Sequence, residues 1–256
     1  MTADARDALR ERVWADLREV ARPDSRFGWD FAEFIADYEG SDRGAERLLS
    51  WAEDAGRDRW FVTPDNNLDA LRERLIERGR PFLMPTYGIV RGVLRLDPAD
   101  VPSGQAAFAA TLDGMTRFAE RVPIEDLERD AATRDVMVTG ASFVTRDGLR
   151  MGKGHGFFDL EWAICRRVGL ADADTAVVAA VHDAQLVDPS DAPDAIVAEH
   201  DTVVDRIVTP TRTVVVGDPP AKPEGVRWSL LDRETVDRIP PLRTLWERDG
   251  RPSLDG

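Results

Sequence analysis

The first twenty residues place apolar side chains at the period of a helix. Leu9, Val13, Leu17 and Val20 fall on one stripe when each residue advances by 100°. The pattern therefore predicts an amphipathic helix over residues 2–21.

Two arginines accompany that stripe, Arg6 within it and Arg10 at its edge. Cations along the buried face of a helix indicate an anion nearby. The alternative is that both side chains extend past the helix end and keep their charges in water. This helix alone does not favour one over the other.

Further along, short apolar runs alternate with segments of helical period. Residues 175–181 are apolar at consecutive positions, as in a parallel strand that is buried on both faces. Helices that alternate with such strands predict stacked α/β layers. We expect strands at residues 59–63, 81–85, 135–145, 175–181, 206–209 and 213–216, further helices at 29–56 (broken near Gly40), 67–79, 158–168 and 231–239, and a loop with a helix within 95–134.

The segment from Asp147 to Asp159 carries the most specific chemistry. It reads D-G-L-R-M-G-K-G-H-G-F-F-D, follows a predicted strand and opens a predicted helix. Backbone N–H groups in such a turn and at a helix N-terminus bind phosphate, and Arg150 and Lys153 would neutralise it. An ordinary tight turn is the alternative. Lys153 favours phosphate, because a chain with only two lysines among 34 cations keeps a compact point charge here.

Two other polar clusters are weaker candidates. His182, Asp183 and Gln185 follow the buried strand, at the sheet edge where α/β proteins bind ligands, but a histidine that caps the strand end explains them equally well. Residues 199–201 read E-H-D, which an acidic helix N-terminus explains better than a site does. The three histidines and one cysteine are too scattered for a zinc site.

Composition narrows the class of partners. The chain has 48 acidic and 34 basic residues, for a net charge of −14, and 32 of the cations are arginine. This balance is typical of a salt-adapted, haloarchaeal cytoplasm, although GC-rich coding would also favour arginine. It disfavours nucleic-acid binding. The sequence lacks a membrane-length apolar run and a signal peptide, and it has a single cysteine, so we expect a cytoplasmic protein without a membrane partner.

Several ordered motifs resemble the 5-formyltetrahydrofolate cyclo-ligase family. Residues 150–159, R-M-G-K-G-H-G-F-F-D, are similar to its signature R-L-G-x-G-x-G-Y-Y-D. Residues 199–209, E-H-D-T-V-V-D-R-I-V-T, resemble its H-D-x-x-(V/L)-D-x-(I/V)-(I/V)-T, and Arg6 and Arg10 stand where the family has basic residues in its first helix. The likeness covers residues 5–217 and is strongest to a divergent branch, the methenyltetrahydrofolate synthetase domain-containing proteins.

The resemblance implies an α/β fold, a three-layer α/β/α sandwich with a mainly parallel sheet of the NagB/RpiA/CoA-transferase-like kind. Residues 1–217 would form this single domain and residues 218–256 a C-terminal extension. The implied activity is an ATP- and Mg²⁺-dependent ligase reaction that converts 5-formyltetrahydrofolate to 5,10-methenyltetrahydrofolate with release of ADP and phosphate.

The resemblance also assigns roles to residues. Arg150, Lys153 and Asp159 would be catalytic, and Asp159 and Asp201 would hold Mg²⁺. The expected ATP-binding residues are Arg6, Arg10, Gly152, Lys153, Gly154, His155, Gly156 and Phe157.

Three departures from the family concern the folate side. Leu160 replaces the arginine that commonly follows the signature aspartate, residues 62–67 offer no match for a folate-side glutamate, and Tyr87-Gly88-Ile89 stands where the divergent branch often has P-R-L. An active cyclo-ligase is the leading hypothesis. The alternatives are a sister enzyme that uses ATP on a thiamin-related substrate, since that branch has been linked to thiamin metabolism, and a non-catalytic nucleotide- or folate-binding protein. Retention of the loop glycines disfavours the last.

Overall fold

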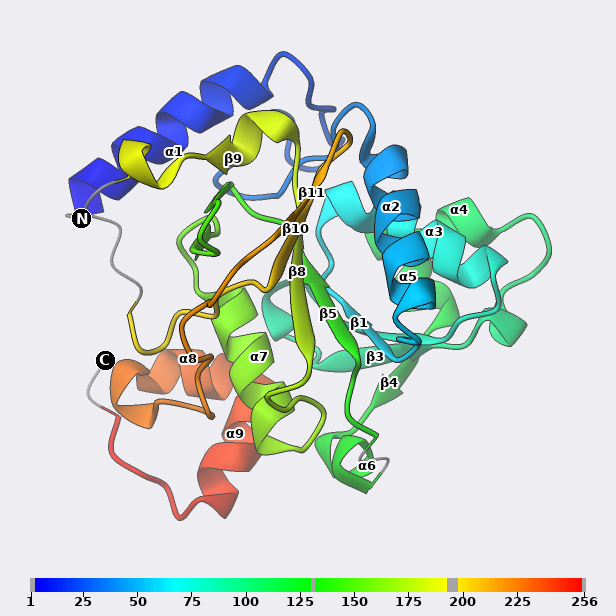
Figure 1. The fold of residues 1–256 in the computed structure, drawn as a ribbon. Helices are drawn as coiled ribbons and strands as arrows, with labels where there is room; N and C mark the ends of the chain where they lie inside the picture. Colours follow the sequence, from blue (N-terminus) through cyan, green and yellow to red (C-terminus); the bar gives the residue numbers. More distant parts are fainter. Residues whose placement is uncertain (1–2, 130–131, 193–197, 255–256) are drawn as a thin grey trace.

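A computed structural model describes residues 3–129, 132–192 and 198–254, with side chains from residue 7 onward. An eight-stranded sheet forms its centre (Figure 1). The strands of this sheet are β1 (Trp60–Val62), β2 (Phe82–Pro85), β3 (Val93–Leu96), β4 (Glu120–Val122), β5 (Val136–Thr139), β8 (Ala176–Ala180), β10 (Arg206–Val208) and β11 (Thr213–Val215). Their order is β11-β10-β8-β5-β1-β2-β3-β4; the strands from β10 to β2 run parallel, and β11, β3 and β4 pair antiparallel at the edges.

Both faces of this sheet are buried, because alternate side chains of each strand enter different apolar clusters. In β5, Val136 and Val138 pack on one face and Met137 on the other. The helices on the first face are α2 (Ser41–Asp54), α3 (Asp69–Glu77), α4 (Ala106–Ala110) and α5 (Leu112–Phe118). Those on the second face are α6 (Ile124–Arg129), α7 (Phe157–Arg167) and α9 (Pro240–Arg248). The expected α/β sandwich with a mainly parallel sheet is confirmed.

A second, three-stranded sheet supports the N-terminal helix. It consists of β7 (Arg150–Met151), β6 (Phe143–Thr145) and β9 (Leu186–Val187), in that order. The helix α1 (Ala3–Leu17) packs Leu9 and Val13 against Phe143 and Val187. The predicted apolar stripe therefore fixes α1 beside the small sheet, as Figure 1 also shows for α1 and β9.

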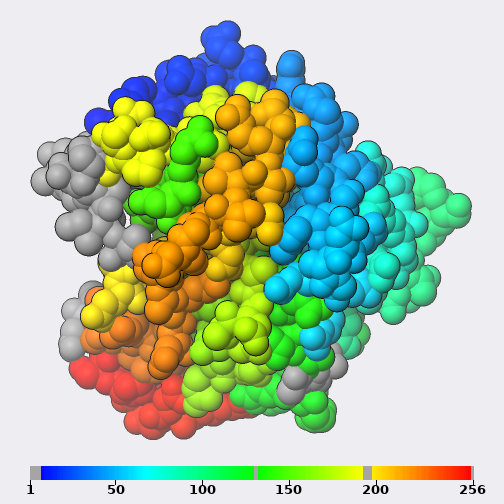
Figure 2. Space-filling view, viewed as in Figure 1, coloured from blue at the N-terminus to red at the C-terminus, as the bar shows by residue number. Residues whose placement is uncertain are grey.

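The C-terminal segment belongs to the same packed body. After β11, the short helix α8 (Arg233–Arg238) precedes α9, and Ile239, Leu242 and Leu245 are fully buried in the cluster that contains α7. In the space-filling view of Figure 2, the red C-terminal atoms lie along the lower edge of the molecule, packed against its main body. The division at residue 217 stays a prediction.

Several sequence expectations need correction. The single strand expected over residues 135–145 is two strands, because the chain turns at Gly140, where a side chain would come within 2.7 Å of Ile35 and Asn67. Of the helix expected over 29–56, only α2 is present, and the first helix ends at Leu17. Within 95–134 the described residues form the end of β3, a 3-10 turn, β4 and three short helices, and α9 was not expected.

Short 3-10 turns complete the framework: η1 (Asn66–Leu68), η2 (Tyr87–Ile89), η3 (Pro98–Asp100), η4 (Asp183–Gln185), η5 (Pro189–Asp191) and η6 (Trp228–Leu230). Within the ranges given above, none of the helices has the length and apolar character that a membrane span requires.

Candidate active site

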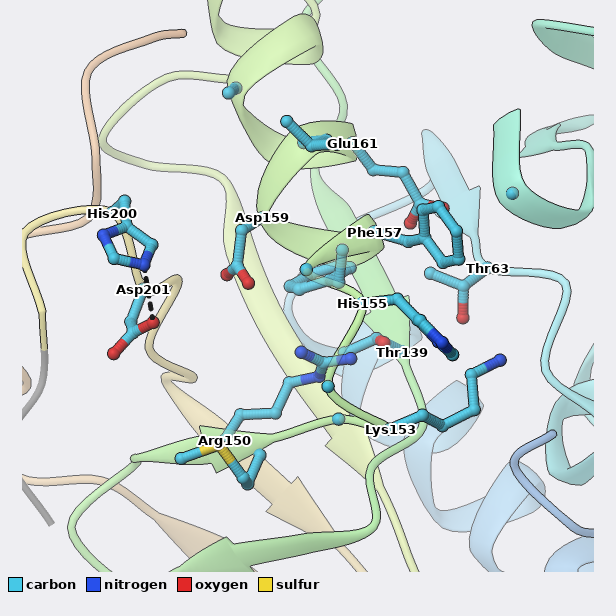
Figure 3. A pocket seen from close by; sticks show the side chains of 18 of the residues that line it. Thr63, Thr139, Arg150, Lys153, His155, Phe157, Asp159, Glu161, His200 and Asp201 are labelled. Carbon is cyan, nitrogen blue, oxygen red and sulfur yellow. Dashed lines mark ion pairs between the residues drawn. The ribbon is translucent and has the colours of Figure 1, made fainter. Parts of the chain in front are cut away.

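A cavity of about 530 Å³ lies at the carboxyl ends of the parallel strands β1 and β5, where Thr63 and Thr139 line it (Figure 3). This is the edge of an α/β sheet at which ligands bind. Further walls are formed by Arg10, Phe34 and Ile35, by residues 64–66 and 87–88, by residues 150–161 with Ala163, by His200 and Asp201, and by Pro223, Gly225, Val226, Arg227, Leu230, Leu231 and Thr235.

The glycine-rich loop forms the floor of this cavity between β7 and α7. Gly154 has φ +112° and Gly156, the N-cap of α7, has φ +65°, which are conformations that other residues rarely adopt. Gly152, Gly154 and Gly156 all line the cavity, so the loop backbone and the first turn of α7 face the same space. Strand, glycine turn and helix are therefore arranged as a phosphate cradle requires.

Two guanidinium groups are fixed against this loop. Arg10 Nε donates a hydrogen bond to the carbonyl oxygen of Gly152 at 3.0 Å. Arg150 Nε donates to the carbonyl oxygen of Gly140 at 3.0 Å, and its guanidinium carbon lies 4.7 Å from the centre of the Phe158 ring. Both side chains line the cavity, so α1 contributes a cation to the loop at the position that the family resemblance had assigned to Arg10.

Lys153 reaches the opposite side of the loop. Its Nζ donates to the carbonyl oxygen of Glu33 at 3.1 Å and lies 4.8 Å from the centre of the Tyr87 ring. Burial lowers the pKa of Lys153, and the carboxyl groups of Asp65 and Glu161 oppose that shift. The side chain is thus a positioned cation rather than a freely solvated one.

Two carboxyl groups face the cavity from its other side. Asp159 Oδ1 accepts a hydrogen bond from the backbone N–H of Thr202 at 2.8 Å, and Asp201 Oδ2 accepts one from the N–H of Ala198 at 2.8 Å. Burial raises the pKa of Asp159; the charge of Arg150 opposes the shift, and that of Asp201 adds to it. In Figure 3, Asp159 points toward His200 and Asp201, away from Lys153.

These two carboxylates fit Mg²⁺ better than a metal ion whose ligands all come from the protein. Among the described residues, His, Cys, Asp and Glu nowhere form a group of three or more that could hold a metal ion. Mg²⁺ is usually bound by one or two carboxylates together with phosphate oxygens of a substrate. Asp159 and Asp201 could supply the two carboxylates.

Two further acids in the cavity escaped the sequence reasoning. Asp65 Oδ2 accepts hydrogen bonds from the Thr63 hydroxyl at 2.5 Å and from the N–H of Gly140 at 2.9 Å. Glu161 is only 5 % exposed, and burial raises its pKa well above its ordinary value. In the sequence, Glu161 stands three residues after Phe158 and one before Trp162, a spacing that puts it on the same side of α7 as these apolar residues.

The tail also contributes a wall that the sequence did not indicate. Trp162 Nε1 donates to the carbonyl oxygen of Pro223 at 2.7 Å, and Arg227 pairs with Glu199 at 2.8 Å. These contacts hold the segment from Pro223 to Thr235 against the Asp159 end of the cavity. Leu230, which lines the cavity, is 54 % exposed.

His182 and Asp183, at the end of β8, stabilise the fold and do not belong to the cavity. His182 Nδ1 accepts from the N–H of Ala184 at 3.2 Å, and Asp183 Oδ1 accepts from the hydroxyls of Thr209 and Thr211 at 3.0 and 2.6 Å. Neither His182 nor Asp183 lines the cavity described above. The capping explanation accounts for both residues.

Nearly all residues that the sequence selected meet at one place. The residues that line the cavity are Arg10, Arg150, Gly152, Lys153, Gly154, His155, Gly156, Phe157, Asp159 and Asp201. Arg6 lies on α1, but its side chain is outside the described residues. The roles assigned to these residues stay predictions.

Comparison with known proteins gives matches of sequence and of structure. The sequence model of the 5-formyltetrahydrofolate cyclo-ligase family matches residues 2–210. Proteins named methenyltetrahydrofolate synthase domain-containing protein are similar over nearly the whole chain: the human protein is 28% identical over 249 residues (96% of this chain, 63% of that protein), and the mouse protein is 30% identical over 258 (98% and 66%). The chain thus spans about two thirds of these relatives' length. An NMR structure of Aquifex aeolicus 5,10-methenyltetrahydrofolate synthetase aligns with TM-score 0.49 and 15% identity, covering 84% of this chain and 94% of that one.

Proposed function

Given that the chain belongs to the 5-formyltetrahydrofolate cyclo-ligase family, we propose that it converts 5-formyltetrahydrofolate to 5,10-methenyltetrahydrofolate with consumption of ATP. One observation carries the proposal: the loop from Arg150 to Gly156, the first turn of α7 and the acids Asp159 and Asp201 all line one cavity. Phosphoryl transfer needs positioned cations and a metal carboxylate more than a nucleophilic side chain.

The proposed reaction has two parts. The formyl oxygen takes the γ-phosphoryl group of ATP and ADP leaves. N10 then attacks the activated carbon, and loss of phosphate and of the N10 proton gives the methenyl bridge. The loop N–H groups would bind the β- and γ-phosphates, and Arg10, Arg150 and Lys153 would neutralise charge that develops on the transferring group. Asp159 and Asp201 would hold Mg²⁺, which when bound screens the charge of the phosphates.

A sister enzyme that uses ATP on another substrate is the second candidate. Two observations favour it: Leu160 stands where the family commonly has arginine, and the cavity wall from Pro223 to Thr235 lies beyond the family match at residue 210. A cavity with a different wall would admit a different second substrate. A thiamin-related compound is the candidate to test first.

An absorbance assay for methenyltetrahydrofolate distinguishes the two. Purified protein in molar KCl is given Mg-ATP and 5-formyltetrahydrofolate, and we expect product that is lost in Asp159→Asn. No product from a preparation that still binds Mg-ATP would reject the cyclo-ligase and favour the sister enzyme. No binding of Mg-ATP at all would reject both.

A further inference from the structure

Glu161 is a buried acid that the proposed phosphoryl transfer does not use. It lies in the second turn of α7, lines the cavity and is 5 % exposed. Its Oε2 atom is buried and has no hydrogen-bond partner within the described part of the chain. A buried polar atom left unpaired costs about 1–3 kcal/mol, so a carboxyl group placed this way is poorly explained by stability.

The side chain is directed toward the half of the cavity that lies opposite the two metal-binding candidates. In Figure 3, Glu161 leaves α7 on the side of Phe157 and Thr63, whereas Asp159 leaves it on the side of His200. Around it stand the charges of Asp65, Arg150, Lys153 and Asp159, which oppose one another. Among the described residues, Glu161 forms no ion pair, whereas Arg10, Asp201 and Arg227 of the same cavity each form one.

The cavity has walls suited to a flat ring. Phe34, Tyr87 and Phe157 line it from three separate segments of the chain, and the Tyr87 ring lies 4.8 Å from Lys153 Nζ, one of the charges around Glu161. Aromatic faces bind planar heterocycles, while one or two placed polar groups fix their orientation. Asp65 is less available for that purpose, because its Oδ2 already accepts hydrogen bonds from Thr63 and Gly140.

We propose that Glu161 binds the amino-substituted pyrimidine edge of the second substrate and thereby determines its specificity. A carboxylate can accept from two adjacent N–H groups, and a carboxylic acid can accept from an amino group while donating to a ring nitrogen. The ring system of a reduced folate and the pyrimidine of a thiamin-related compound both present such an edge.

This inference rests on the proposed function only in placing the second substrate in the same cavity. Substitution by leucine tests it, because leucine fills similar volume and removes the unpaired atom. We expect Glu161→Leu to melt at the same temperature or higher, to bind Mg-ATP within twofold of the wild type, and to bind the heterocycle at least tenfold more weakly. Glu161→Gln, which keeps one acceptor and one donor, should lose less affinity.

Isothermal titration measures these affinities with two probes, 5-formyltetrahydrofolate and 4-amino-5-hydroxymethyl-2-methylpyrimidine, in molar KCl. Glu128→Gln on α6, which pairs with Arg248 outside the cavity, is the matched control and should bind both compounds like the wild type. Unchanged probe affinity in Glu161→Leu would overturn the inference. So would a leucine variant that fails to fold, since that would make Glu161 structural, and so would a wild type that binds neither probe.

Failure of the inference and failure of the cyclo-ligase proposal are separable. If the wild type forms methenyltetrahydrofolate and Glu161→Leu keeps the same KM, the activity stands and the role of Glu161 falls. The opposite outcome is that no product forms, the pyrimidine probe binds the wild type, and this binding is lost in Glu161→Leu. The role of Glu161 then stands and the cyclo-ligase proposal is rejected.

Discussion

At the scale of single residues, both the composition of the chain and the geometry of the cavity identify Lys153 Nζ as a cation of the site. It is one of two lysines in the chain, and its Nζ is held by the carbonyl of Glu33 and the ring of Tyr87 at the edge of the glycine loop. The other lysine, Lys222, pairs with Asp205 at 2.8 Å and does not line the cavity. The chain therefore offers a natural pair for comparison.

Lys153→Met should weaken Mg-ATP binding or turnover at least tenfold, a loss of about 1.4 kcal/mol, because a point charge at the phosphates is removed. Titration calorimetry at fixed KCl measures the binding. Lys222→Met is the control, in which we expect unchanged ATP affinity. Equal affinities in the wild type and Lys153→Met would remove the assigned role of Lys153.

Site residues could be predicted where they belong to a local sequence motif. They were missed where only tertiary packing brings them to the cavity. Arg10, Arg150 and Asp159 were selected by their place in motifs, and the fold brings them to one cavity. Asp65 and Glu161 were missed because each is a single acid in an acid-rich chain. Asp65 is distinguished from the surface carboxylates only by its hydrogen bonds to Thr63 and Gly140, and Glu161 only by the packing of α7 against the sheet.

At the scale of elements, the turn from β7 into α7 sets the geometry of the site. Gly154 adopts φ +112°, and a side chain there would lie 3.7 Å from Arg10. The space is sufficient for a methyl group, so the backbone angle is the constraint. Glycine is thus needed at position 154 because of its backbone conformation, and not because a side chain would lack space.

Gly154→Ala should lower the free energy of unfolding by about 1–3 kcal/mol and weaken Mg-ATP binding, because the loop must strain or change shape. Urea unfolding and titration of Mg-ATP measure the two effects. Gly217→Ala, at an exposed glycine with ordinary φ and open space around it, should change neither. If Gly154→Ala behaves like Gly217→Ala, the loop conformation is not what holds phosphate.

The amino end of β5 is fastened by one carboxyl group. Asp135 accepts hydrogen bonds from Arg59 Nη2 at 2.7 Å and from the backbone N–H groups of Asp58 and Arg59 at 3.0 and 2.9 Å. Burial alone would raise the pKa of Asp135, but these bonds outweigh it and lower the pKa to about 2. The carboxylate form is therefore preferred in the folded state.

The pKa of Asp135 is lower in the folded than in the unfolded chain. Its contribution to the free energy of unfolding is therefore complete above pH 3.8 and is lost as the pH falls through about 2. Asp135→Asn should cost about 1 kcal/mol at pH 7, because the half-exposed Arg59 lets solvent screen part of the interaction that lowers the pKa. Urea unfolding of both proteins between pH 7 and pH 2 should show the difference narrowing at acid pH. A difference that is constant with pH would contradict the electrostatic explanation.

Strands were easier to predict than connections. The apolar runs gave β1, β8 and β10 nearly at their observed bounds, because strands buried on both faces must be apolar throughout. Residues 29–39 were expected to be helical, yet their aromatic side chains Phe31, Phe34 and Tyr38 pack with α1 in an irregular segment. Such packing between distant segments leaves no periodicity in the sequence.

At the scale of the whole molecule, the segment after Gly217 both contributes to the apolar core and lines the cavity. Ile239, Leu242 and Leu245 are fully buried beside α7, and residues 223–235 wall the cavity. The sequence from Asp218 onward is rich in proline and charge, which concealed both roles. We infer that the tail folds together with the sheet.

A chain that ends at Gly217 should lose at least about 5 kcal/mol, the burial of these three side chains, which approaches the whole stability of a typical domain. Circular dichroism and urea unfolding measure this loss. Leu242→Ala is the milder variant and should cost about 2–5 kcal/mol. A truncated chain that unfolds with the wild-type midpoint would mean that the tail is an independent addition.

The central claim, that this cavity couples ATP cleavage to closure of a folate ring, is tested most directly by stoichiometry. ADP, phosphate and methenyltetrahydrofolate are measured together in one reaction of the purified protein with Mg-ATP and 5-formyltetrahydrofolate. We predict one ADP and one phosphate for each methenyltetrahydrofolate formed, and none of the three when either substrate is omitted. ATP cleavage without methenyltetrahydrofolate, or product formed without ADP, would contradict the account.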